Sequence, residues 1–147
     1  MIKEIRNFIS EDECKKLITF YNWNKHKAFQ YRDTFPLYTK RFKNITDRVE
    51  SLCVELNSQI KLNVHHITMW PQGSYMDPHT DPSDDVFAAL IYLNDDYSGG
   101  ETCFEQFKIT PETGKLLVFS NSEMLHWVSE VKDATRYTLS MWFIKSQ

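Results

Sequence analysis

The sequence has no long apolar run and only three cysteines, and both shortages exclude classes of protein. No stretch approaches the roughly 20 apolar residues of a membrane-spanning helix. Met1 to Arg6 lack the apolar core of a signal peptide, so we expect a cytoplasmic protein with no membrane partner. The cysteines are odd in number and far apart, which fits neither a disulfide framework nor a zinc ribbon. We expect three reduced core residues, namely Cys14, Cys53 and Cys103.

The chain also lacks a strong charge of either sign. A formal net charge of −3 gives the whole molecule no electrostatic footprint for nucleic acid, so no nucleic-acid partner is expected. The stretch from His26 to Lys43 is locally basic, which usually marks a solvated surface. There are no repeats, low-complexity tracts or linkers. With 147 residues, 41% of them hydrophobic, we expect a single domain over residues 1–147, and its oligomeric state stays open.

Helical signals are confined to the first 60 residues. Ser10-Glu11-Asp12-Glu13 is a capping box that predicts a helix reaching about Tyr21. Residues 22–44 hold no period and contain Phe35-Pro36-Leu37, which predicts a long irregular connection with at most one short strand. Apolar residues at steps of three and four predict a second helix from about Thr46 to Ser58. Residues 1–60 are therefore expected to be a mainly helical cover.

Beyond Lys61 the apolar period changes to two and turn signals multiply, which is typical of consecutive short strands. In the last strand one face is wholly apolar, so the helices must cover it, and the other opens with Arg136 and Thr138. A polar inner face suits a barrel or jelly roll that holds a ligand. The fold class is α+β, with residues 61–147 as the core. The expected strands lie at about 62–70, 86–93, 101–105, 115–119, 126–131 and 136–143.

His79 and Asp81 stand two residues apart, and in an extended strand their side chains share one face. A second, distant histidine would complete the set of two histidines and one carboxylate that leaves coordination positions open, as non-haem ferrous oxygenases require. The pair alone is weak, because such spacing arises by chance about half the time in a chain with this many acids and histidines. The surrounding aspartates and prolines also fit a surface loop.

His126 is the better third ligand, because it begins a predicted strand directly after a turn. His65 and His66 are adjacent on another predicted strand, where only one can face inward, and His66 is the next candidate. The alternative for His126 is a packed histidine beside Trp127.

Arg136 begins the last strand ten residues after His126, and a hairpin would bring the two together. An unpaired buried guanidinium is costly, so Arg136 on an inward face needs an anion. A ligand carboxylate could satisfy it with two parallel hydrogen bonds. The alternative is a surface ion pair with Glu130 or Asp133.

The order His79-x-Asp81, His126, Arg136-x-Thr138 resembles the Fe(II)/2-oxoglutarate-dependent dioxygenases, specifically their prolyl-4-hydroxylase-like branch. Other stretches are similar to successive strands and turns of that branch. The resemblance covers roughly the whole chain and is most specific over residues 70–143. These further stretches are Phe8-Ile9-Ser10 to Ile18, Tyr92 to Asp96, Gly99 to Phe104, Pro111 to Phe119 and Arg136 to Phe143.

The resemblance implies a role for each matching residue. His79, Asp81 and His126 would be the metal ligands, and Arg136 would bind the distal carboxylate of 2-oxoglutarate. Thr138 and Tyr92 match positions that help to hold the same carboxylate. Trp70 stands where many relatives place another cosubstrate-contacting tyrosine, but an indole donates one hydrogen bond and accepts none. A carboxylate at Asp81 argues against the halogenating relatives, which need that ligand position empty.

The resemblance also implies a double-stranded β-helix, a jelly-roll or cupin-like barrel, with the N-terminal helices on its outer face. Its cofactors would be Fe(II), 2-oxoglutarate and O2, with ascorbate as an optional addition. The implied reaction hydroxylates an unactivated C–H of a prolyl, peptidyl or free amino-acid substrate and releases succinate and CO2. Two alternatives are a metal-binding cupin-like module without turnover and a nucleic-acid demethylase of the same superfamily.

A peptide or small-molecule substrate is the expected partner. Two segments are expected to contact it, namely Gln30 to Arg41, with Arg32 and Tyr38 as donors or surfaces, and Pro82 to Asp85. The alternative is that both are solvated loops.

Overall fold

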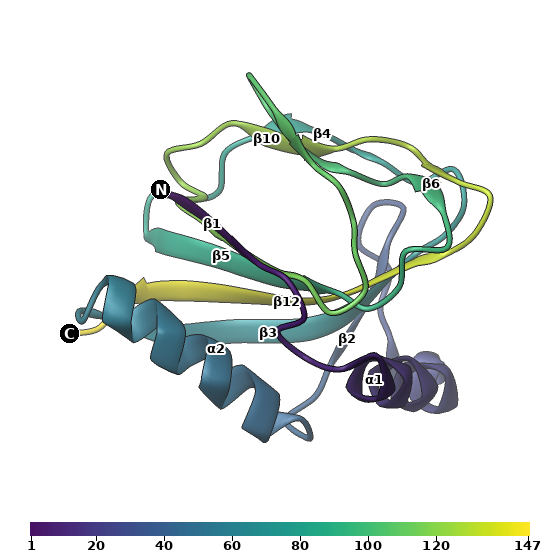
Figure 1. Cartoon of the computed structure of the whole chain (residues 1–147), viewed down its shortest axis with the longest axis horizontal. Coiled ribbons are helices and arrows are strands. Elements are labelled where there is room, and N and C mark those ends of the chain that lie inside the picture. The colour runs from purple at the N-terminus through teal and green to yellow at the C-terminus, as the bar shows by residue number, and fades with distance from the viewer.

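Two antiparallel sheets face each other, and two helices cover the outer face of the larger sheet (Figure 1). The computed structural model describes all residues from 1 to 147. The helical elements are α1 (Glu11–Asn24), a short 3-10 helix (Lys25–Lys27) and α2 (Lys43–Leu56). The strands are β1 (Ile2–Ile5), β2 (Phe35–Tyr38), β3 (Ile60–Trp70), β4 (Met76–His79), β5 (Asp85–Tyr92), β6 (Ser98–Gly99), β7 (Thr102–Phe104), β8 (Lys108–Ile109), β9 (Leu116–Phe119), β10 (His126–Val128), β11 (Val131–Lys132) and β12 (Arg136–Lys145).

The larger sheet has six strands in the order β1-β9-β5-β12-β3-β2. β12 lies near its centre, paired with β3 on one side and β5 on the other. The edge strands β1 and β2 both come from the first 60 residues, so that segment is less uniformly helical than expected. Pro36 is tolerated within β2 because an edge strand leaves one row of backbone groups unpaired.

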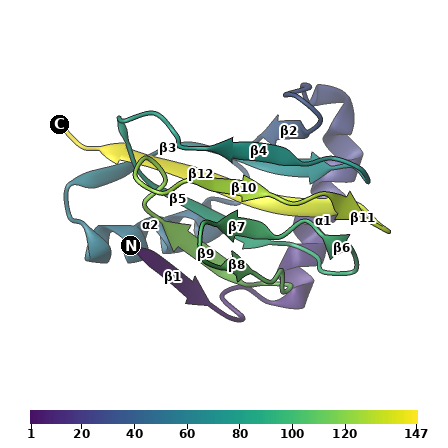
Figure 2. The same cartoon turned by 90° about the horizontal axis from the view of Figure 1, so that it is seen from above.

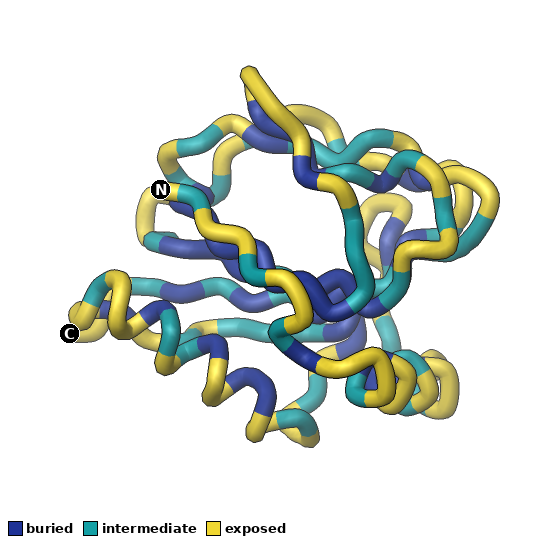
Figure 3. Tube along the Cα trace, viewed as in Figure 1, coloured by how far each residue is buried: buried dark blue, intermediate teal, exposed yellow.

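The helices bury the apolar face of this sheet, as the alternation in the last strand predicts. Leu139, Met141 and Phe143 of β12 join Leu17 of α1 and Val49 of α2 in a cluster of 19 buried residues. Figure 3 shows the division, with buried residues along the central strands and exposed ones on the outer sides of the helices. No helix has both the length and the apolar character needed to cross a bilayer.

The predicted capping box starts α1. The Glu13 amide donates to the Ser10 hydroxyl, and the Ser10 amide donates to the Glu13 carboxylate, each over 3.0 Å. The helix continues three residues beyond the predicted end. α2 begins at Lys43, three residues earlier than predicted and without a side-chain cap, and Lys43 pairs with Asp47 one turn later.

The smaller sheet has four strands in the order β4-β10-β7-β8 and lies over the larger one (Figure 2). A second cluster of six buried residues, including Tyr92, Phe104 and Phe119, packs between the sheets. The two facing sheets agree with the predicted double-stranded β-helix. No strand of one sheet pairs with a strand of the other, so they do not close into a barrel.

The expected hairpin between His126 and Arg136 is wrong. The predicted strand 126–131 divides into β10 and β11, and β10 pairs with β4 and β7 in the smaller sheet. β12 belongs to the larger sheet. The backbone turns at Asp133, which has a positive φ of 73°, and carries the chain from one sheet to the other. His126 and Arg136 therefore lie on opposite sheets of the sandwich.

Candidate metal centre and cosubstrate pocket

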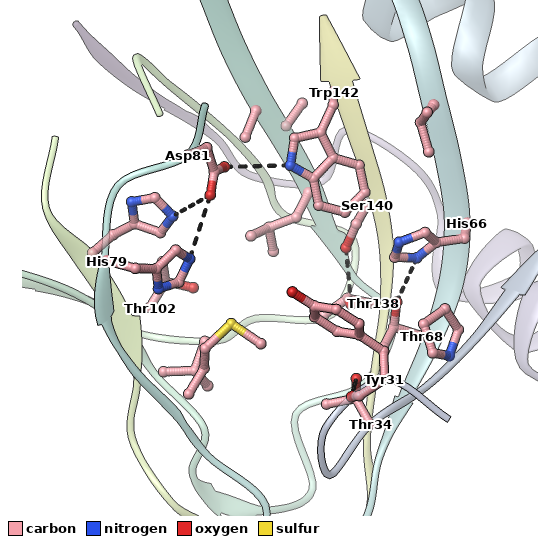
Figure 4. A pocket seen from close by; sticks show the side chains of 18 of the residues that line it. Tyr31, Thr34, His66, Thr68, His79, Asp81, Thr102, Thr138, Ser140 and Trp142 are labelled. Atoms are coloured by element: carbon pink, nitrogen blue, oxygen red, sulfur yellow. Dashed lines mark hydrogen bonds and ion pairs between the residues drawn. The ribbon is translucent and has the colours of Figure 1, made fainter. Parts of the chain in front are cut away.

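A cavity of about 580 Å³ lies between the two sheets and opens at one end (Figure 4). Strands of both sheets and the segment before β2 form its walls. Its lining includes most side chains that the sequence singles out, namely Trp70, His79, Asp81, His126, Arg136 and Thr138, together with His66, Ser140 and Trp142.

His79 and His126 lie directly opposite each other on the paired strands β4 and β10. Their ring centroids are 4.4 Å apart, and the planes are inclined by 57°. In each residue Nδ1 lies 2.7 Å from the carbonyl oxygen two residues earlier, of Asp77 and Met124 respectively. A carbonyl only accepts, so Nδ1 must carry the proton and Nε2 presents its lone pair. Both Nε2 atoms lie near the same side chain, Asp81.

Asp81 follows β4 directly, and its two carboxylate oxygens have different partners. Oδ1 lies 3.4 Å from Nε2 of His79 and 3.6 Å from Nε2 of His126. Oδ2 accepts hydrogen bonds from Nδ2 of Asn121 at 2.7 Å and from Nε1 of Trp142 at 3.3 Å. Oδ2 is thus occupied by fixed donors, and only Oδ1 faces the imidazoles.

These contacts hold the carboxylate ionised. Burial alone would raise the pKa of Asp81, but its contacts with His126, His79 and Asn121 lower the pKa well below its usual value. The Asp81 carboxylate also raises the pKa of His79 above its ordinary value. The site is therefore a compact set of one anionic carboxylate oxygen and two imidazole nitrogens.

The donor set fits a divalent transition metal. All three ligand atoms lie within 4.8 Å of one another. Neighbouring ligands bound at about 2.1 Å stand about 3 Å apart, so small rotations of these side chains would complete the site. Two imidazoles and one carboxylate on one side leave the opposite side free for other ligands, which suits ferrous iron. The hydrogen bonds of the ring Nδ1 atoms and of Oδ2 are the outer partners that orient such ligands.

Arg136 lies in the same cavity and is 1% exposed. Its Nε and Nη2 atoms are buried without a hydrogen-bond or ion-pair partner in the chain, so neither Glu130 nor Asp133 neutralises it. Its Cζ lies 4.5 Å from the ring centroid of Trp70 and 5.6 Å from that of Tyr92. Aromatic faces offset part of a buried positive charge but leave the N–H groups unsatisfied. The cavity therefore contains a cation that lacks an anion.

The other predicted cosubstrate residues surround this guanidinium in different ways. Trp70 is paired with Arg136 across β3 and β12, and its buried Nε1 has no partner. Thr138 is buried, and its hydroxyl lies 3.2 Å from that of Ser140. Tyr92 does not line the cavity, because its hydroxyl is engaged with Thr102 at 2.6 Å. Its ring centroid lies 5.6 Å from Cζ of Arg136.

Tyr97 is a neighbour of Arg136 that the sequence does not single out. A side chain at Gly100 would come within 2.8 Å of the Tyr97 ring and 3.0 Å of Arg136 Cδ, so only glycine fits there. The Tyr97 hydroxyl is buried without a partner, and burial raises its pKa. It is a further unsatisfied donor beside the guanidinium.

The open end of the cavity is aromatic. Phe29 stacks on Tyr38 with centroids 5.4 Å apart, Tyr38 meets His66 edge-on at 5.4 Å, and His66 lies 4.8 Å from Trp142. Nδ1 of His66 contacts the Thr68 hydroxyl at 2.6 Å, and burial lowers its pKa to about 4. His66 is therefore a neutral wall residue, and no carboxylate comes near it as Asp81 does to His126.

The two segments expected to contact a substrate contribute unequally. Arg32 and Tyr38 line the cavity, and so do Pro82 and Asp85. Arg41 does not, because it lies against Phe20 on the helical side of the molecule.

Asn121 is a site residue that sequence reasoning missed. It is 0% exposed, and its side-chain amide donates to both Asp81 and Asp85. Its backbone carbonyl accepts from the Asp81 amide. It stands in a turn of polar residues that has no periodic pattern. Trp142 was detectable, since it continues the inward-facing alternation from Arg136.

Residues 62–144 match the sequence pattern of the 2OG-Fe(II) oxygenase superfamily. Prolyl 3-hydroxylase 2 of Homo sapiens is 34% identical over 65 residues, which are 39% of this chain and 9% of the human protein. The Mus musculus protein of the same name matches over the same shares. The match thus spans about a tenth of the length of these curated relatives.

Solved structures resemble the whole chain. A viral collagen prolyl hydroxylase from Paramecium Bursaria Chlorella virus-1, in complex with 2OG, has a TM-score of 0.82 at 21% identity and covers 99% of this chain and 96% of its own. A prolyl-4-hydroxylase from Pseudomonas putida has 0.78 at 18%, covering 99% and 93%. A prolyl hydroxylase from Trichoplax adhaerens, in complex with a hypoxia inducible factor peptide fragment, has 0.79 at 16%, covering 98% and 83%. At these identities the likeness establishes the fold.

Proposed function

This chain belongs to the 2OG-Fe(II) oxygenase superfamily, and from that membership we propose that it hydroxylates an unactivated C–H of a prolyl or other peptidyl substrate. The reaction would consume 2-oxoglutarate and dioxygen and release succinate and CO2. The observation that carries the proposal is the pairing of two features in one cavity. A buried guanidinium without an anion lies in the same space as two histidines and an aspartate arranged for a metal.

In this proposal His79, Asp81 and His126 hold the iron. Their outer hydrogen bonds keep both imidazoles in one tautomer and leave one carboxylate oxygen for the metal. Arg136 binds the distal carboxylate of 2-oxoglutarate through two parallel N–H···O bonds. Trp70 packs beneath the guanidinium and fixes its plane.

The bound iron would supply activation of dioxygen and oxidation of the cosubstrate. The chain's own residues bind and orient the reactants and exclude water. No general base is needed to remove a hydrogen from an unactivated C–H, and none is present on the inner wall. His66 stays neutral through its lowered pKa, and Trp142 covers the space beside Asp81 with an apolar ring.

The mouth of the cavity supports a peptide over a very small substrate. Phe29, Tyr31 and Tyr38 are large apolar side chains that are 42%, 50% and 58% exposed there. Exposed rings beside a cavity are typical of surfaces that bind extended or proline-containing chains. One structural neighbour is described in complex with a peptide fragment, which supports the same choice here. Arg32 and Asp85 at the mouth would contact backbone or charged groups of the peptide.

The two alternatives explain less. A metal-binding module without turnover leaves Arg136 buried without an anion. A nucleic-acid demethylase needs a positively charged groove at the site. Here Asp81 and Asp85 line the cavity opposite a single exposed arginine, Arg32.

Succinate formation tests the proposal. The purified chain, loaded with Fe(II) under anaerobic conditions, is given oxygen, 2-oxoglutarate and either proline-containing peptides, free amino acids or methylated oligonucleotides. We expect peptides to stimulate succinate release and to gain one oxygen by mass. Metal binding with no succinate under any condition would favour the module without turnover. Stimulation by the oligonucleotides alone would favour the demethylase.

A further inference from the structure

Part of the basic stretch noted in the sequence lies outside the cavity between the sheets, because Arg41 lies against Phe20 on the helical side of the molecule. Residues 15–48 contain nine lysines and arginines against two acidic residues, a net charge of +7. The rest of the chain contains eight against eighteen, a net of −10. Within this segment, α1 and the start of α2 lie on the outer face of the larger sheet (Figure 1), whereas residues 29–38 pass along the cavity between the sheets. The basic segment thus brings Lys15, Lys16 and Arg41 together on one face of the molecule.

A groove of about 500 Å³ lies within this basic face, between α1 and the turn before α2. Its floor is aromatic and its rim is cationic. Phe20 and Phe42 meet edge to face with centroids 5.3 Å apart, and Trp23 is 80% exposed beside them. The cations of the rim are Lys15, Lys16 and Arg41.

The rim cations are available to a partner. Arg41 lies 5.4 Å above the Phe20 ring, which positions its guanidinium at the groove. Lys15 and Lys16 face Glu11 and Asp12 one helical turn earlier at 3.8 and 3.5 Å, and all four side chains are at least 72% exposed. Exposed pairs of this kind contribute about 0–1 kcal/mol, so a better placed carboxylate can replace them.

We propose that this groove docks an acidic peptide segment of another protein, with one apolar side chain inserted beside Trp23. Carboxylates on either side of that anchor would pair with Lys16 and Arg41. Exposed tryptophan and arginine are the residues that most often dominate the energy of a protein interface. The groove volume of about 500 Å³ lies within the range of ordinary ligand-binding clefts.

A single strand of nucleic acid is the weaker candidate. Such strands bind through bases stacked on successive aromatic faces. Here Phe20 is covered by Arg41 and meets the edge or face of Phe42, so Trp23 alone has a fully free face. A peptide with one apolar side chain between acidic residues would instead contact both the exposed Trp23 ring and the cations of the rim.

Fluorescence anisotropy with a labelled peptide tests the inference. The probe has a central phenylalanine flanked by glutamates, and a second probe has glutamines in place of the glutamates. We expect the acidic probe to bind more tightly, to lose affinity as salt rises and to change the emission of Trp23. The double variant Lys16→Glu, Arg41→Glu and the single variant Trp23→Ala should each weaken binding by about tenfold or more.

The controls keep the result decisive. Lys132→Glu reverses an exposed charge on β11, far from the groove in the sequence and on the other side of the sheet, and should leave affinity unchanged. Trp23 is too exposed to support the fold, so its variant should melt with the parent. Equal affinity of the parent and the two groove variants would overturn the inference. So would tighter binding of a single-stranded oligonucleotide that displaces the peptide.

Discussion

Replacing Arg136 by leucine should separate the stability of the ligand-free protein from its affinity for 2-oxoglutarate. Two buried nitrogens of this side chain have no partner, and an uncompensated buried charge costs several kcal/mol. Contacts with the rings of Trp70 and Tyr92 offset about 1–2 kcal/mol each of this cost. We therefore expect ligand-free Arg136→Leu to be more stable than the parent by about 1–2 kcal/mol, or roughly 2–8 °C in Tm for a chain of this length.

When 2-oxoglutarate is bound, the parent should become more stable than Arg136→Leu. Two charge-assisted hydrogen bonds of about 1.5–3 kcal/mol each are lost, so the Kd for 2-oxoglutarate should rise by about a hundredfold or more. At a concentration 100 times its Kd, the ligand stabilises the parent by about 2.7 kcal/mol, and the variant by much less.

Thermal denaturation, with and without Mn(II) and 2-oxoglutarate, measures both effects. Arg32→Leu is the matched control, because it removes an exposed arginine at the mouth of the same cavity. It should change neither the ligand-free Tm nor the ligand-induced rise by much. The reasoning fails if ligand-free Arg136→Leu melts below the parent, or if 2-oxoglutarate raises the Tm of both proteins equally.

Three further results are expected. His126→Ala should weaken anaerobic Fe(II) binding, measured by calorimetry, by more than the 10–100-fold that loss of an outer hydrogen bond costs. His65→Ala should leave Fe(II) affinity unchanged, and unchanged affinity in His126→Ala would exclude His126 as a ligand. Burial lowers the pKa of His66 to about 4 from its ordinary 6.5, so its contribution to stability is present above pH 6.5 and is lost as pH falls toward 4. His66→Asn should flatten the dependence of the free energy of unfolding on pH in this range, and an unchanged slope would contradict the prediction. Burial raises the pKa of Cys14 to about 11 and of Cys53 to about 12, so iodoacetamide at pH 8 should label them only after unfolding, as mass spectrometry would show; rapid labelling of the native chain would refute their burial.

The sequence predicts the large elements of this fold because their signals are local. The capping box at Ser10 to Glu13 fixes the start of α1, and period-two alternation marks β3, β5 and β12. The same alternation places Arg136 on the inner face and predicts which side the helices cover. A local pattern of this kind is read correctly wherever one face of an element is buried and the other is not.

Elements without that contrast escape prediction. β4 contains Asp77 and Pro78, which favour a turn, and it becomes a strand only because β10 pairs with it. β1 is a short edge strand. β10 and β11 are predicted as one strand over 126–131, because both are too short for a period to locate the break between them. The predicted hairpin between the strands of His126 and Arg136 was wrong for the same reason. The chain switches sheets between β10 and β12 within a few residues whose sequence indicates only a turn.

The distribution of apolar contacts explains why the candidate site needs its outer hydrogen bonds. The larger sheet is anchored to the helices by 19 buried residues, whereas the cluster between the sheets has six. β4 and β10, which carry the two histidines, lie on the thinly packed side, and packing alone cannot fix a side chain to within the few tenths of an ångström that a metal site requires. Trp142 reaches across from the larger sheet to Asp81, and the buried Asn121 holds the same oxygen. The larger sheet therefore helps to fix the carboxylate ligand through Trp142, while the carbonyls of Asp77 and Met124 hold the two imidazoles from within their own segments.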